Sequence, residues 1–147
     1  MAETTTITQE QLLAEGWQCF DNLAGFTVSV GPLWRKFNEQ GHPIAMGIFV
    51  TEAQTNNHIG TLHGGALMTF ADMALGSSVV ASLGEERFKA VTTALNTQFV
   101  SVAKVGDFVF CEPEIVSQKK KLLFVRGVIQ TNERVIGNCD GIWSVLS

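Results

Sequence analysis

At 147 residues the chain is long enough for one domain, spanning residues 1–147, and too short for a second independent core. Its formal charge of -4, with one basic cluster at Lys119, Lys120 and Lys121, excludes the basic surface expected of a nucleic-acid-binding protein. Three cysteines without a CxxC spacing predict neither a disulfide framework nor a zinc knuckle, and they indicate free thiols in a reducing compartment.

The N-terminal segment has no secretory signal and predicts a short helix. "MAETTTITQEQLLAEG" lacks a basic start followed by an apolar stretch, and no window of the chain approaches the ~18 apolar residues that span a bilayer. We therefore expect a cytoplasmic protein with no membrane association. Thr8 with Gln11 three residues later forms a capping-box pattern, which predicts a peripheral helix ending near Gly16.

The following segments show strand and helix patterns in turn. "GFTVSVGPLWRKF" (25–37) and "PIAMGIFVTEAQ" (43–54) predict two strands joined around the turn-forming "NEQGH". A loop at 56–62 and a long apolar helix at about 63–83 come next. Four more strands are predicted at about 90–100, 108–117, 122–131 and 135–146, with short polar connections typical of a meander.

This order predicts an α+β fold. The long helix should lie on one face of an antiparallel sheet of about six strands that wraps around it, and a short N-terminal helix should lie at the periphery. The long helix is apolar on every side except at Asp72, so we expect it to be buried all round. The hydrophobic content of 46%, high for this size, points to a buried subunit interface.

Asp72 is the only charged residue of the long helix, and its helical neighbours include no cation. An ionised carboxylate in apolar surroundings is costly unless it is hydrogen-bonded, paired or kept for a purpose. Two interpretations stay open. Asp72 either meets a Ser, Thr or backbone donor and serves packing only, or it acts as a general base or nucleophile in catalysis.

The sequence His63-Gly64-Gly65 begins the same helix. Two glycines bring unshielded backbone N–H groups to the positive end of the helix dipole, where an oxyanion or a polarised carbonyl is favoured. A tight turn without a ligand is the alternative interpretation. Ala66 follows where a nucleotide phosphate loop needs Lys, which excludes that motif.

The spacing of Gly64 and Asp72 predicts a dimer. Eight helical residues at a rise of about 1.5 Å put the two ~12 Å apart, beyond the hydrogen-bond reach of a single substrate atom. Two antiparallel helices side by side across a two-fold interface would bring Asp72 of one chain to the Gly64 amide of the other. We therefore expect a homodimer with two composite sites. A dimer of dimers, a homotetramer, is the expected larger assembly, although the spacing does not decide between dimer and tetramer or fix how two dimers would pair.

The segment "NNHIGTLHGGALMTFADMALG" (56–76) resembles the His-Gly-Gly motif of the hotdog-fold acyl-CoA thioesterases. The resemblance is to the branch that includes the phenylacetyl-CoA-type bacterial enzymes and the mammalian thioesterase-superfamily proteins, and it covers about residues 44–147. It implies a hotdog domain with sites between protomers. It also implies that an acyl-CoA substrate is hydrolysed, without a cofactor, to a free carboxylic acid and coenzyme A.

The resemblance further implies roles for individual residues. Asn57 would position the substrate carbonyl or the attacking water, and the Gly64 amide would polarise the thioester carbonyl. His63 would orient the turn or contact the thioester, unless it only satisfies the loop backbone. Asp72 from the partner chain would be the general base or nucleophile, and Thr92, at the start of the strand after the helix, would hold the water.

Contacts to the rest of the substrate are also implied by the resemblance. In relatives, the segments that match "FVSVAK" (99–104) and "SQKKKL" (117–122) contact coenzyme A, although a lysine run on a hairpin is otherwise a solvated turn. The hairpin "LWRKFNEQGHPI" (33–44) is specific to a subset of the family and predicts an acyl pocket of its own shape. The residues expected to bind substrate are Gly65, Thr93 (the alternative to Thr92 if the register shifts by one), Phe99, Val100, Ser101, Lys104, Lys119, Lys120 and Lys121.

Other functions fit the residues less well. A hotdog dehydratase or hydratase would pair a catalytic His with Glu or Asp at spacings that this chain lacks, and a non-catalytic acyl-CoA-binding protein would use the same scaffold. His58 and His63 have no third residue to complete a metal site. The acyl group itself stays open, because the large apolar residues could line a pocket or form ordinary core: Met68, Met73, Phe99, Phe124 and Trp143.

Overall fold

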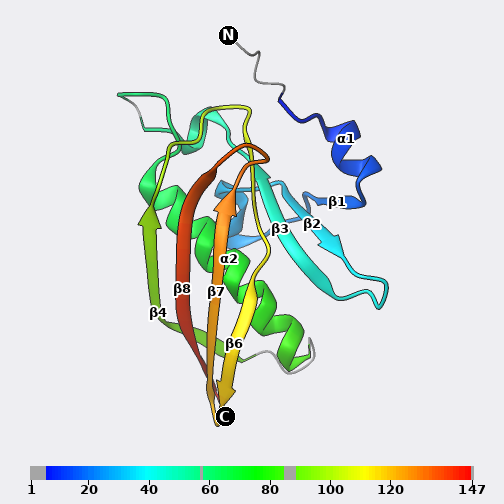
Figure 1. Cartoon of the computed structure of the whole chain (residues 1–147), viewed down its shortest axis with the longest axis vertical. Helices are drawn as coiled ribbons and strands as arrows, with labels where there is room; N and C mark the ends of the chain where they lie inside the picture. Colours follow the sequence, from blue (N-terminus) through cyan, green and yellow to red (C-terminus); the bar gives the residue numbers. More distant parts are fainter. Residues whose placement is uncertain (1–5, 57, 85–88, 147) are drawn as a thin grey trace.

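The computed structural model describes residues 6–56, 58–84 and 89–146 (Figure 1). Within these residues, the helices are α1 (Gln9–Ala14), the 3₁₀ helices η1 (Gly25–Ser29) and η2 (Glu52–Gln54), and the long helix α2 (Gly64–Leu83). The strands are β1 (Trp17–Phe20), β2 (Leu33–Phe37), β3 (Pro43–Phe49), β4 (Ala90–Phe99), β5 (Phe108–Cys111), β6 (Glu114–Lys119), β7 (Leu122–Gln130) and β8 (Val135–Val145).

All eight strands belong to one antiparallel sheet. The strand order is β1-β2-β3-β5-β7-β8-β4, and β6 pairs with β7 outside this path. Helix α2 lies along one face of the sheet and contacts β3, β4, β6, β7 and β8 (Figure 1). The α+β arrangement of a long central helix, an antiparallel sheet and a short N-terminal helix is therefore confirmed, with eight strands where the sequence predicted about six.

The difference in strand number has local causes. The segment predicted as one strand at 108–117 is divided into β5 and β6, and Pro113 lies between them, where it has no N–H to donate to a ladder. Strand β1 was not predicted. In the segment 25–37, η1 occupies the first part, so only β2 is extended.

The predicted four-stranded meander is confirmed for its last three segments, where β6 pairs with β7 and β7 with β8, and is wrong for its first strand. Strand β4 pairs with the last strand, β8, whereas β5 lies between β3 and β7. Because α2 covers the inner face, the loop 100–107 passes around the start of the helix, where Leu62 N–H donates to the Ala103 carbonyl at 2.8 Å. The Arg134 guanidinium holds this loop by donating to the Val102 carbonyl and to Asp107 Oδ2, each at 2.8 Å.

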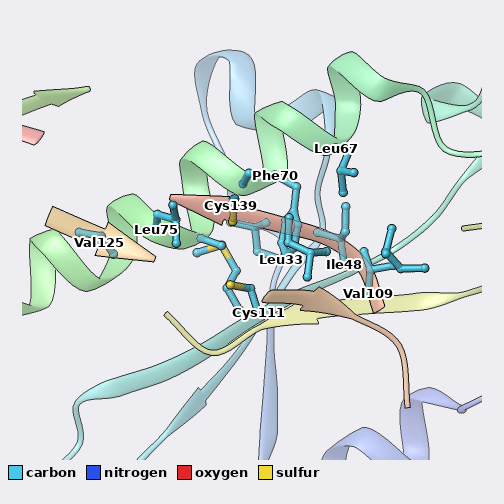
Figure 2. Close-up of a cluster of buried hydrophobic side chains, with 14 of the residues drawn as sticks. Leu33, Ile48, Leu67, Phe70, Leu75, Val109, Cys111, Val125 and Cys139 are labelled. Atoms are coloured by element: carbon cyan, nitrogen blue, oxygen red, sulfur yellow. The ribbon is translucent and has the colours of Figure 1, made fainter. Parts of the chain in front are cut away.

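One side of α2 forms the core with the sheet. Leu67, Phe70 and Leu75 pack among strand residues that include Ile48 and Val109 (Figure 2). The helix approaches β7 closely because Gly127 has no side chain. A Cβ there would lie 2.5 Å from Cys111 Sγ and 3.1 Å from Leu75 Cδ2.

The rest of α2 is not covered within one chain, so the expectation of burial all round is wrong for a single protomer. Met68, Asp72 and Val80 are only half-buried, and Ala81 is exposed. The sheet reaches one side of a helix, and the apolar residues on the other sides have no neighbour among the described residues that buries them fully. The expectation that no window is apolar enough to span a bilayer is also wrong on composition, because α2 is long and apolar enough. A core helix has this composition too.

Helix α1 lies beside the opposite face of the sheet, as expected of a peripheral helix. Its capping box is present, since Gln11 N–H donates to Thr8 Oγ1 and Thr8 N–H donates to Gln11 Oε1. The fully buried Leu12 anchors it in a second apolar cluster with Trp17, Trp34, Ala45 and Phe108.

Candidate active site

Asp72 and Thr92 meet at the middle of α2. Thr92 Oγ1, on β4, donates to Asp72 Oδ1 at 2.6 Å. The hydroxyl of Thr93 instead shares a hydrogen bond with Ser144 on β8. Of the two threonines considered, Thr92 is therefore the one whose hydroxyl contacts the Asp72 carboxylate. This bond alone would suit either interpretation of Asp72, as a packing residue or as a catalytic one.

Asp72 also lines a cavity, which a role in packing would not need. The cavity has a volume of about 480 Å³, within the range of small-molecule sites. It lies between α2 and residues of η1, β2, β3, β4 and β8, with a wall of mostly apolar side chains. Its lining residues are Leu23, Thr27, Leu33, Arg35, Met46, Asp72, Met73, Gly76, Ser77, Val80, Ala90, Val91, Thr92 and Trp143.

Sequence reasoning found part of this lining. Met73 and Trp143, suggested as pocket residues, are among the lining residues. Phe124 lines a different cavity, on the β4–β8–β7–β6 part of the sheet. Arg35 was not predicted, although strand alternation gave a signal. Arg35 lies two residues after Leu33, so both side chains face the helix side of β2.

At the start of α2, His63 is the N-cap residue. Its Nδ1 accepts a hydrogen bond from Gly65 N–H at 2.8 Å, so this amide is already used within the turn. The Gly64 N–H, one of the first amides of the helix, has no acceptor among the described residues. The Phe99 ring lies 3.4 Å from the point where a Gly64 Cβ would be. Among the described residues, the Gly64 and Ala66 amides are thus the first-turn donors left for a ligand, and Gly64 is the one predicted to bind the thioester carbonyl.

Asn57, predicted to position the carbonyl or the water, lies outside the described residues. Hydrogen bonds of Asn56 and His58 connect the described parts of this loop. Asn56 N–H donates to the Thr61 carbonyl at 2.7 Å, and His58 N–H donates to Asn56 Oδ1 at 3.0 Å.

The predicted substrate-binding residues lie at two ends of the chain. Phe99 is near the start of α2, followed along the chain by Val100, Ser101 and Lys104, and all four are exposed. Lys119, Lys120 and Lys121 are at the β6–β7 turn, near the opposite end of the sheet (Figure 1).

The pairing of β4 with β8 gives the scale of that separation. Phe99 pairs with Gly137, whereas Ala90 pairs with Val145, whose N–H donates to the Lys121 carbonyl. At about 3.4 Å per residue, the two ends are 25–30 Å apart. Within one chain, the lysines therefore cannot share a small ligand with the Gly64 amide.

The charges around the cavity are not paired with one another. The ion pairs among the described residues are Arg126 with Glu114 and Arg134 with Asp107, and neither includes Asp72 or Arg35. Within the same residues, no three His, Cys, Asp or Glu side chains are grouped as metal ligands. The arrangement offers a carboxylate, a hydroxyl, an apolar cavity and a helix-terminal amide.

Known proteins are similar to this chain in sequence or in architecture. A Pseudomonas aeruginosa protein named "Putative esterase PA0474" is 27% identical over 129 residues, which make up 88% of this chain and 94% of that protein. A Bacillus halodurans protein solved with CoA is 27% identical, with a TM-score of 0.64 over 71% of this chain and 68% of that one.

A third similarity is to the PaaI protein from the phenylacetic acid degradation operon of E. coli. It is 20% identical, with a TM-score of 0.63 over 70% of this chain and 72% of that one, which shows a shared fold. Residues 59–137, more than half of the chain, match the family model described as "Thioesterase superfamily". The chain therefore has the hotdog fold and belongs to the thioesterase superfamily.

Proposed function

We propose that the protein hydrolyses an acyl-CoA thioester to a free carboxylic acid and coenzyme A. The observation that carries the proposal is the position of Asp72, which accepts a hydrogen bond from Thr92 and lines a cavity large enough for an acyl group. The Bacillus halodurans relative was solved with CoA, which supports the same ligand class for this chain.

In the proposed reaction, Asp72 accepts a proton from a water molecule oriented by Thr92. The water oxygen attacks the thioester carbonyl carbon while the Gly64 N–H, at the positive end of α2, stabilises the oxyanion. As the tetrahedral intermediate collapses, the C–S bond breaks. The thiolate of coenzyme A takes up the proton from Asp72, and the acyl group leaves as a carboxylic acid.

The site is proposed to form between two protomers. Asp72 and Gly64 are ~12 Å apart along one helix, so one chain cannot bring both to one carbonyl. Two features support an antiparallel partner at this surface. Strand β4 is at the edge of the sheet, and α2 leaves part of its apolar surface half-exposed. In such a dimer, the lysine end of one protomer approaches the Gly64 end of the other, where Lys119, Lys120 and Lys121 would meet the coenzyme A phosphates.

A dimer of dimers is the proposed larger assembly. The outer surface of the β4–β8–β7–β6 part of the sheet has a second cavity of about 390 Å³, lined in part by Val116, Phe124 and Ile142. Val116 is 53% exposed in the single chain, and together with Phe124 and Ile142 it gives this surface an apolar area that a second dimer would cover.

The proposal is tested by measuring thiol release from a panel of acyl-CoA substrates that includes straight-chain, aryl-acetyl and hydroxybenzoyl thioesters. We expect turnover with at least one class and a fall of at least about a hundredfold in kcat for Asp72→Asn, with substrate binding retained. Asn is the matched change because it keeps the size of the side chain and removes only the basic carboxylate.

The panel also separates the other functions. Loss of crotonyl-CoA absorbance without thiol release would identify a hydratase. Tight binding of acyl-CoA with no thiol release would identify a non-catalytic binding protein. Either result, or equal turnover by Asp72→Asn, rejects the proposed mechanism.

A further inference from the structure

Arg35 is the one cationic side chain among the described residues that line the cavity beside Asp72. Its Nε atom is buried and has no hydrogen-bond partner. Its guanidinium carbon lies 5.3 Å from the centroid of the Phe20 ring, so the group stacks on an aromatic face. Arg35 is therefore held in place, but the structure gives its Nε–H no acceptor.

A cationic side chain on the wall of a mostly apolar cavity, with no anionic partner, indicates a site for an anionic ligand. Arg35 is half-buried there, and a guanidinium that is partly removed from water gains free energy from an acceptor. No carboxylate in the described part of the chain forms an ion pair with Arg35, and Asp72, on the same cavity, is more than 4.0 Å from it. The two terminal guanidinium nitrogens are not closed to water as Nε is, and their N–H groups form a planar fork that fits the two oxygens of a carboxylate.

The rest of the wall determines where such a carboxylate would lie. Leu33, Met46, Val80 and Trp143 contribute apolar surface to the same cavity, which suits a methylene chain. Asp72 repels a second carboxylate near the thioester, whereas Arg35 attracts one elsewhere in the cavity. The volume of about 480 Å³ is within the range of small-molecule sites and leaves room for an acyl chain between Asp72 and Arg35.

We propose that Arg35 binds a carboxylate at the far end of the acyl chain, so that the preferred substrates are coenzyme A thioesters of dicarboxylic acids. The inference rests on the proposed thioester hydrolysis, which it deepens by naming the substrate class. Arg35 acts on specificity and has no part in the proton transfer. A mostly apolar cavity with a cationic donor on its wall favours a chain that pairs this donor over one that leaves it unpaired.

The test compares pairs of substrates that differ only at the chain end: glutaryl-CoA with pentanoyl-CoA, adipyl-CoA with hexanoyl-CoA, and suberyl-CoA with octanoyl-CoA. For the wild-type protein we expect kcat/KM to be at least about tenfold higher for the carboxylate member of the best pair. Arg35→Met, which keeps the stem on Phe20, should lower this ratio by about ten- to a hundredfold, the range expected for a hydrogen bond to a charged group.

Two further variants separate charge from structure. Arg35→Lys keeps the charge without the fork, and it should retain part of the preference. The matched control is Lys36→Met, one residue along the strand. The Lys36 ammonium lies 5.9 Å from the centroid of the Trp17 ring, which belongs to the second apolar cluster, the one that anchors α1. Lys36→Met should leave the substrate ratio unchanged.

Three outcomes would overturn the inference. The first is equal kcat/KM of the wild-type protein for both members of every pair. The second is an unchanged ratio in Arg35→Met. The third is a kcat/KM of Arg35→Met that falls equally on all substrates, together with weaker inhibition by free coenzyme A. The last would place Arg35 at the coenzyme A phosphates or in a subunit contact. If no thioester is hydrolysed, the proposed function fails separately. Calorimetric binding of free adipate to the wild-type protein and to Arg35→Met then decides the inference, because only Arg35-dependent binding supports it.

Discussion

Thr92 Oγ1 donates a 2.6 Å hydrogen bond to Asp72 Oδ1, and this bond joins the edge strand β4 to the middle of α2. The hydroxyl is the only side-chain donor to that carboxylate among the described residues. Because Asp72 also faces the cavity, the bond fixes the orientation of the carboxylate where a substrate would lie.

Removing that hydroxyl should impair turnover more than folding. Thr92→Val keeps the shape of the side chain but cannot donate, and we expect kcat to fall about ten- to a hundredfold. Thr92→Ser should keep most of the activity. Thr93→Val, which loses a hydrogen bond to Ser144 and none to Asp72, should change kcat by less than about threefold. Steady-state kinetics would contradict this assignment if the Thr93 variant were the more damaged.

The Gly64 amide can be removed without breaking the helix. Gly64 is the first helical residue, where proline is tolerated, and His63 before it has ψ 138°, which is compatible with a following proline. Gly64→Pro should therefore lower kcat about a hundredfold or more through loss of the oxyanion donor. Gly64→Ala, which keeps the N–H and would meet Phe99 at 3.4 Å, is the control and should be less impaired.

Thermal unfolding measured by circular dichroism shows whether Gly64→Pro keeps the fold. An active, folded Gly64→Pro protein would mean that this amide does not polarise the thioester.

A site shared between protomers predicts complementation. Asp72→Asn and Gly64→Pro should each be inactive alone. In a mixed dimer, one of the two sites combines the intact Asp72 of one chain with the intact Gly64 of the other. Random reassortment should therefore restore activity to about a quarter of the wild-type value. The measurement is thiol release after the two proteins are mixed, partly unfolded and refolded together, and no recovery would indicate a site within one chain.

Lys120 has a backbone conformation that favours glycine. It is the first residue of the two-residue β6–β7 turn and has φ +54°, in the left-handed region. Lys120→Gly should raise the free energy of unfolding by up to about 1 kcal/mol, because glycine adopts this conformation without strain. If the lysine contacts a coenzyme A phosphate, the same variant should raise KM for acyl-CoA with little change in kcat.

A stabilised variant with unchanged KM would leave Lys120 as an ordinary turn residue. Lys119→Gln removes a charge without changing the turn conformation, so it is the comparison variant. If the lysines contact phosphates, the increase in KM of both variants should be smaller at high salt, because salt screens the interaction in the wild-type protein.

The cysteines should differ sharply in reactivity. A hydrogen bond with Cys139, together with burial, raises the pKa of the Cys111 thiol well above its usual value, and both side chains are in the core (Figure 2). Burial, with a contribution from Asp21, raises the pKa of the exposed Cys19 more modestly. A thiol reagent should therefore modify one cysteine in the native protein, faster as the pH rises, because the thiolate is the reactive form. All three should react in denaturant, and rapid modification of more than one in the native protein would contradict this arrangement.

Local sequence patterns predicted several helices and strands of this protein. The apolar run bounded by the His63 cap and Gly84 specified α2 to within a residue, and alternation with polar breaks specified β4, β7 and β8 almost as well, since these signals depend on near neighbours. The spacing of the His-Gly-Gly turn and Asp72 likewise identified two parts of the candidate site, and the family resemblance identified Thr92.

Only the tertiary structure decided the pairing of β4 with β8, the one-sided cover of α2 and the position of Arg35 beside Asp72. These features depend on contacts between segments far apart in the chain. The loop 100–107 passes the start of the helix on its way from β4 to β5, and no local pattern of residues records such a path. Arg35 was not predicted as a site residue, and only the fold places it on the wall of the cavity, where no carboxylate of the described residues pairs with it.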